Sequence, residues 1–135
     1  MTGYLLDTNV ISELRKPKPH GAVVHWLSGL QESQVHLSAV SIGELQAGVE
    51  RTRQHDATKA SQIKSWVDEL ADSHQILAMD SACFRDWARL MQGKSDHVIE
   101  DMMIAATARV HRLTLATRNV HDFERVDVRL LNPFL

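Results

Sequence analysis

Short apolar runs alternate with longer amphipathic stretches along this chain. In the longer stretches apolar residues recur every three or four positions, which predicts helices; the clearest runs from about Asp56 to Asp72. Strands separated by helices pair in parallel through right-handed crossovers. We therefore predict a three-layer α/β/α domain with a parallel sheet of four or five strands, at Tyr4–Leu6, Gln34–Val40, Ile76–Met79, Leu113–Thr117 and Val128–Leu131.

Length and composition favour one ordinary globular domain covering residues 1–135. The hydrophobic fraction of 44% and the charged fraction of 24% exclude a disordered chain. The single cysteine, Cys83, excludes an internal disulfide framework and suits a reducing compartment. No apolar run reaches the ~18 residues of a membrane span, and residues 1–9 lack the features of a secretory signal. We expect a cytoplasmic protein that does not enter a membrane.

Four acidic residues fall near the predicted carboxyl edge of the sheet or at the start of a helix. They are Asp7, Glu44, Asp101 and Asp122. Clustered carboxylates raise one another's pKa, and a hard divalent cation relieves that repulsion. Mg²⁺ or Mn²⁺ held in this way suits phosphodiester hydrolysis. The net charge of −2 excludes binding of nucleic acid by bulk positive charge alone, but it permits such an enzyme.

Each acid also has a purely structural interpretation, and the sequence alone leaves both open. Ser41 and Glu44 have the spacing of a capping box. Asp7 is placed to cap the helix that follows it, and Asp101 to complement a helix dipole. Asp122 has the setting of a loop residue. Their joint placement at one predicted edge is the feature that capping does not explain.

Four blocks of the sequence resemble the PIN-domain family, in particular its VapC-type toxins and their FitB-like branch. The blocks occur in the order found in that family and span nearly the whole chain. A closing Asn132–Phe134 segment also fits. The blocks are Leu5–Leu14, Ser41–Gly48, Asp101–Ala108 and Thr117–Phe123.

The resemblance implies a small Mg²⁺- or Mn²⁺-dependent endoribonuclease, the toxin of a toxin–antitoxin pair. Such a protein is neutralised by a cognate antitoxin, forms a homodimer and binds operator DNA only through the antitoxin. Asp7 and Asp101 would be the main metal ligands, with Glu44 as a third acid. Relatives often carry an acid near the position of Asn119, so the resemblance leaves open whether Asp122 or Asn119 completes the site.

The resemblance also implies roles for the polar residues beside the acids. Thr8, Asn9 and Thr117 would hydrogen-bond the carboxylates and fix their positions, as Asn119 would if it does not complete the site. Arg118 would either contact a phosphate of the substrate or form a salt bridge with Asp122.

Two other functions stay open from the residues. One is an RNA- or partner-binding module with a degenerate pocket. The other is a phosphatase with Asp7 as nucleophile, although such sites usually carry a second Asp where this chain has Asn9.

Basic residues and tryptophans offer further candidates for contact with RNA. Two groups of cations would either line an RNA path or form a solvated surface: Arg15, Lys16 and Lys18, and Arg51, Arg53 and Lys59. The tryptophans lie in helical apolar patterns that favour core packing over base stacking; they are Trp26, Trp66 and Trp87.

Overall fold

The computed structural model describes residues 2–135 and contains a five-stranded sheet in which all paired strands are parallel. The strand order is β3-β2-β1-β4-β5, so the first strand is central. This confirms the predicted parallel sheet. The strands are β1 (Tyr4–Leu6), β2 (Val35–Ser38), β3 (Gln75–Leu77), β4 (Thr114–Ala116) and β5 (Leu130–Leu131).

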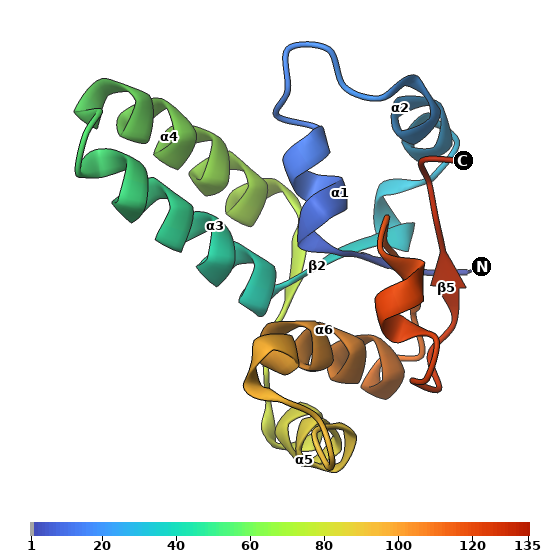
Figure 1. Cartoon of the computed structure of the whole chain (residues 1–135). Helices are drawn as coiled ribbons and strands as arrows, with labels where there is room; N and C mark the ends of the chain where they lie inside the picture. Colours follow the sequence, from blue (N-terminus) through green and yellow to red (C-terminus); the bar gives the residue numbers. More distant parts are fainter. Residues whose placement is uncertain (1) are drawn as a thin grey trace.

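Helices cover both faces of the sheet (Figure 1). In the described residues they are α1 (Thr8–Glu13), α2 (Gly21–Ser28), α3 (Ala39–Arg53), α4 (Ala57–Ser73), α5 (Ser81–Leu90) and α6 (Ile99–Val110), with short 3-10 turns η1 (Glu32–Gln34), η2 (Asp96–Val98) and η3 (Val120–Phe123). Helices α3 and α4 pack together as a hairpin that projects from the body of the domain. None of the helices in the described part of the chain has the length and apolarity to cross a membrane.

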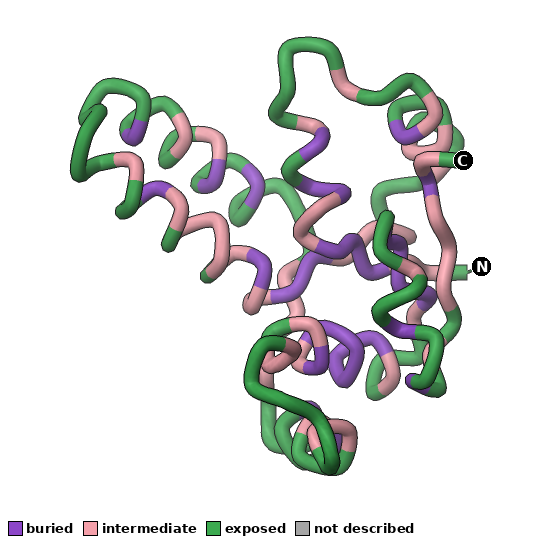
Figure 2. The backbone as a smooth tube through the Cα atoms, in the orientation of Figure 1, coloured by how far each residue is buried: buried purple, intermediate pink, exposed green. Residues whose placement is uncertain are grey.

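Side chains that alternate along each strand divide the core into two layers, as expected for a strand buried on both faces. Leu5 and Leu115 pack with α6 residues on one face. Leu6 and Ala116, each one position further on, pack on the other face with α1 and α2 residues. In Figure 2 the buried segments run through the central strands and along α6.

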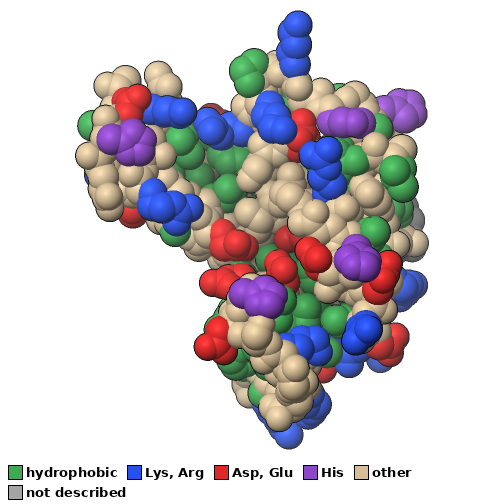
Figure 3. Space-filling view, in the orientation of Figure 1, with side chains coloured by type: hydrophobic (Ala, Val, Ile, Leu, Met, Phe, Trp, Pro, Cys, Tyr) green, Lys and Arg blue, Asp and Glu red, His purple; other side chains and the backbone are tan. Residues whose placement is uncertain are grey.

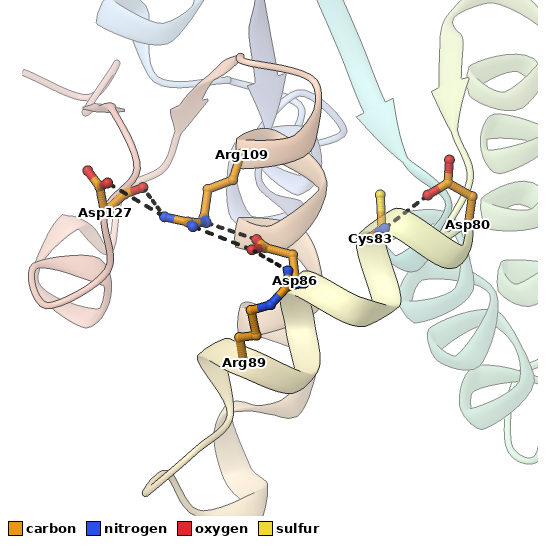
Figure 4. Close-up of polar contacts among 6 residues, drawn as sticks. All are labelled: Asp80, Cys83, Asp86, Arg89, Arg109 and Asp127. Carbon is orange, nitrogen blue, oxygen red and sulfur yellow. Dashed lines mark hydrogen bonds and ion pairs between the residues drawn. The ribbon is translucent and has the colours of Figure 1, made fainter.

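A partly buried ion pair ties α5 to α6 (Figure 4). The Nε of Arg109 donates to Oδ2 of Asp86 at 2.8 Å, and Asp86 is only 7% exposed. Arg109 also donates to the backbone oxygen of Asp127, which links α6 to the segment before β5. At the start of α5 the side chain of Asp80 accepts a hydrogen bond from the Cys83 backbone N–H and so caps the helix.

The elements agree with the predicted ones in type, but several strands are shorter. The predicted strand Gln34–Val40 ends at Ser38, because the Ser38 hydroxyl accepts from the Val40 backbone N–H and begins helix α3. Ser41 therefore lies inside α3, and the capping-box interpretation of Ser41 and Glu44 is wrong. The predicted strand at Val128–Leu131 is reduced to its last two residues.

Candidate functional site

Asp7 stands directly after the central strand and is 4% exposed. Its Oδ1 accepts a hydrogen bond from the Thr8 backbone N–H at 2.8 Å, so Asp7 does cap α1. Its Oδ2 accepts from the hydroxyl of Thr117 at 2.8 Å and from the amide of Asn9 at 3.1 Å. Burial raises the pKa of Asp7, and these three hydrogen bonds oppose that rise. The cap and the candidate ligand are thus the same residue.

The loop after β4 is fixed to Asp7 through shared polar partners. Besides bonding Asp7, the Thr117 hydroxyl accepts from the Asn9 amide at 3.3 Å and from the Asn119 backbone N–H at 3.0 Å. The Oδ1 of Asn9 accepts from the Arg118 backbone N–H at 3.1 Å. This network supports the positioning role expected of Thr117 and Asn9, whereas Asn119 contributes through its backbone.

Glu44, on the second turn of α3, is held by the start of α1. The Thr8 hydroxyl donates to Oε1 of Glu44 at 2.8 Å and lies 2.7 Å from the Ser41 hydroxyl. Because Thr8 has one hydroxyl proton and gives it to the carboxylate, Ser41 is the donor in the second bond. Burial raises the pKa of Glu44, and the negative charge of Asp7 raises it further.

Asp101 lies in the first turn of α6, at the same edge of the sheet. Partial burial is the largest cause that raises its pKa to about 6. The charges of Asp7, Asp122, Glu44 and Glu100 add to that rise, in decreasing order. Three acids from other segments and the adjacent Glu100 therefore act on one carboxyl group, as expected where strand ends and a helix start meet.

Asp122 is less closely bound to the other site residues than expected of a residue that completes the site. It is exposed in η3, and its side chain makes no hydrogen bond or ion pair within residues 2–135, so its influence on Asp7 and Asp101 is through charge alone. The alternative salt bridge between Arg118 and Asp122 is not formed. The Arg118 guanidinium lies 4.6 Å from the centre of the Phe134 ring instead.

Two residues of the cluster have roles that the sequence pattern did not reveal. Ser41 is fully buried against Thr8, but its helix-start spacing suggested a cap. Glu100 adds negative charge next to both Glu44 and Asp101. The sequence does contain a sign of this role for Glu100, because Glu100 and Asp101 are adjacent acids at the predicted start of a helix.

The donor set suits a hard divalent cation. Asp7, Glu44 and Asp101 offer carboxylate oxygens, each has a raised pKa, and none pairs with Lys or Arg in the described part of the chain. A cation among them would offset their repulsion. As placed, no three His, Cys, Asp or Glu side chains of residues 2–135 could together hold an ion, so an ion here would be held by fewer of them with water completing its shell, or by all three after they draw together.

Comparison with known proteins identifies the family of this chain. The family model described as PIN domain matches residues 4–129. The chain belongs to the PIN-domain family. This PIN domain is 36% identical over 137 residues to Toxin FitB of Neisseria gonorrhoeae, covering 96% of the chain and 97% of that protein. It is 33% identical over 135 residues to VapC ribonuclease Y4jK of Sinorhizobium fredii, covering 96% of each.

Solved structures show the same full-length likeness. The structure of FitAcB from Neisseria gonorrhoeae superposes with a TM-score of 0.84 at 34% identity, covering 97% of this PIN domain and 98% of that chain. The structure of FitAB bound to the IR36 DNA fragment also superposes with a TM-score of 0.84. It is 33% identical in sequence, and the match covers 98% of this PIN domain and 96% of that chain. The likeness to both therefore extends over the whole domain, including every segment that contributes an acid to the site.

Proposed function

We propose that this PIN domain is a metal-dependent endoribonuclease that acts as the toxin of a toxin–antitoxin pair. The observation that carries the proposal is the convergence of Asp7, Glu44 and Asp101, three carboxylates with raised pKa and no paired cation. Full-length similarity to a protein named Toxin FitB and to one named VapC ribonuclease supports the substrate class and the biological role.

Asp7, Asp101 and Glu44 would hold Mg²⁺ or Mn²⁺. When bound, such an ion would lower the pKa of a coordinated water and would neutralise charge on the scissile phosphate. The hydrogen bonds from Thr8, Asn9 and Thr117 keep the Asp7 carboxylate in one orientation. Such preorganisation of a ligand by its neighbours strengthens metal sites.

The chain's own residues would orient the attacking water. Thr8 fixes Glu44 through Oε1, which leaves Oε2 to accept a hydrogen bond from that water. In-line attack on the phosphorus breaks the bond to the 3′ oxygen, so the products carry a 5′ phosphate and a 3′ hydroxyl. The chemistry does not use the ribose 2′-hydroxyl; the preference for RNA rests on the ribonuclease relatives.

The partners follow from the same relatives. The solved structures with this fold include FitAB bound to a DNA fragment and VapBC-5, a member of a family of toxin–antitoxin systems. We assign this chain a cognate antitoxin as its protein partner, with operator DNA reached through that antitoxin. We also propose that the chain forms a homodimer and acts in the cytoplasm.

The phosphatase alternative fits the geometry poorly. Both oxygens of Asp7 accept hydrogen bonds, which suits a fixed ligand and weakens the carboxylate as a nucleophile. Asn9 uses its amide to hold Asp7 in place, whereas a phosphatase would use an acid there.

The test is cleavage of a structured RNA pool by the purified protein with Mg²⁺, with Mn²⁺ and with EDTA. Asp7→Ala and Asp101→Asn are expected to abolish metal-dependent cleavage. Asp68→Asn, which removes an exposed acid of α4 paired to Lys64, is the matched control and should cleave like the wild type. Equal cleavage by all variants would reveal a contaminant. RNA binding without cleavage in either metal would favour the binding-module alternative.

A further inference from the structure

A groove of about 760 Å³ runs between α1 with its following loop and the α3–α4 hairpin. In Figure 3 a hollow between the projecting hairpin and the body of the domain has apolar side chains at its base, Lys and Arg side chains along its margins and acidic side chains at its lower end. Its lining includes Leu45, Ile63 and Trp66 as apolar residues and Arg15, Lys16, Arg51 and Lys59 as basic ones.

Three of these cations have no partner in the described part of the chain. Arg15, Arg51 and Lys59 are exposed, and their side chains make no hydrogen bond or salt bridge within residues 2–135. Lys16 differs, because its ammonium group pairs with Glu13 at 2.9 Å. The groove therefore has three unneutralised positive charges around an apolar floor.

Neighbouring cations outside the groove are neutralised. Arg53 pairs with Glu50 at 3.1 Å and Lys64 pairs with Asp68 at 2.8 Å, both on the α3–α4 hairpin. Neither residue lines the groove. The unpaired charge on this hairpin is thus concentrated where it faces the hollow.

The groove is continuous with the acidic site. Thr8 and Glu44 line the groove, and the Thr8 hydroxyl is the group that holds Glu44. A polymer whose scissile phosphate lies at the carboxylates would therefore have its neighbouring nucleotides in the groove.

We propose that the groove binds the single-stranded RNA that flanks the scissile phosphate. Arg15, Arg51 and Lys59 contact its phosphates, and the floor formed around Trp66 packs against unpaired bases. This inference rests on the proposed ribonuclease function and names the residues that would position its substrate.

The charges and the floor favour single-stranded RNA. Unpaired cations spaced along a groove match the repeating negative charge of a phosphate backbone. In an A-form duplex the bases are paired and stacked, whereas a single strand offers their faces to apolar and aromatic side chains. A protein segment is the competing occupant, and the experiment below distinguishes it.

The experiment measures the affinity for a short, fluorescently labelled, unstructured RNA in EDTA, between about 50 and 200 mM salt. The variants are Arg15→Gln, Arg51→Gln, Lys59→Gln and their combination, with Arg53→Gln and Lys64→Gln as matched controls from the same hairpin. Unchanged melting temperatures are expected throughout, because all five side chains are exposed.

Each lost phosphate contact should reduce the slope of log affinity against log salt by about 0.7 on a single strand. At about 0.1 M salt that corresponds to roughly fivefold weaker binding per contact, and to roughly 100-fold for the triple variant. The two controls should keep the wild-type slope and affinity. The same variants should weaken cleavage in Mg²⁺ chiefly through KM.

A triple variant with the wild-type salt slope would overturn the proposal. So would variants that bind RNA normally but lose a stoichiometric complex with the antitoxin, since the groove would then be a protein interface. The proposed nuclease is tested separately: loss of binding in the groove variants, together with no cleavage by the wild type in either metal, would support the groove and refute the nuclease.

Discussion

Replacing Asp101 with Asn should stabilise the protein at neutral and alkaline pH when no divalent metal is present. The carboxyl group of Asp101 has its pKa raised to about 6 by partial burial and by the surrounding acids. Its ionised form is therefore disfavoured in the folded state. Asn has nearly the same shape and carries no charge, so the substitution removes the repulsion and retains most of the packing.

The size of the effect follows from the pKa shift. A rise from 3.8 to about 6 corresponds to about 3 kcal/mol at 1.36 kcal/mol per unit. Asp101 is only partly buried, and water screens part of that repulsion. We expect the free energy of unfolding of Asp101→Asn to exceed that of the wild type by about 1–2 kcal/mol at pH 8.

The sign of the pH dependence is set by which state binds more protons. Between pH 3.8 and about 6 the folded protein keeps the proton of Asp101 while the unfolded chain releases it. The wild type therefore loses stability relative to the variant as pH rises through this window, and the difference is constant above it. Near pH 3.8 and below, the two proteins should be nearly equal.

The assay is urea unfolding in EDTA at several pH values, with the m-value checked for constancy. Asp68→Asn is the control, because this exposed, surface-paired carboxylate should change stability by no more than about 0.5 kcal/mol at any pH. An Asp101→Asn protein less stable than the wild type at pH 8, or a difference that does not vary with pH, would refute the reasoning. In matched solutions without EDTA, free Mg²⁺ at ten times its Kd should stabilise the wild type by about 1.4 kcal/mol and the variant by less.

Three further predictions concern the surroundings of the site. Thr8→Val removes the hydroxyl that holds Glu44, and should lower cleavage or metal affinity about 10- to 100-fold with the fold retained by circular dichroism; Thr8→Ser should restore it. Asp122→Asn should lower cleavage only a few-fold and move the acid limb of the pH–rate profile to lower pH, because this exposed residue acts through charge alone; a complete loss of cleavage would mean it is a ligand. Asp86→Asn removes one charge of the partly buried pair with Arg109 and should cost about 1–2 kcal/mol in urea unfolding without changing RNA affinity.

Local sequence determined the order of elements and the position of several key groups. The apolar run before Asp7 predicts that this carboxylate follows a strand, and it does. Periodicity distinguishes strand from helix within a few residues, so the parallel sheet followed from the pattern. The acid at the start of α6 was also visible, because Asp101 lies in the first turn of a strongly apolar helix.

Only the tertiary structure decided what the remaining groups do. The spacing of Ser41 and Glu44 is that of a cap, and only the helix start at Ser38 together with the contact to Thr8 shows a different role. Thr117 bonds Asp7 across 110 positions of sequence.

The basic residues near positions 15 and 51–59 are likewise separated in the chain but line one groove. Such contacts depend on which strands lie side by side and on where a helix hairpin folds back. Periodicity over a few residues carries no information about either, because it reports only which face of its own element a side chain occupies.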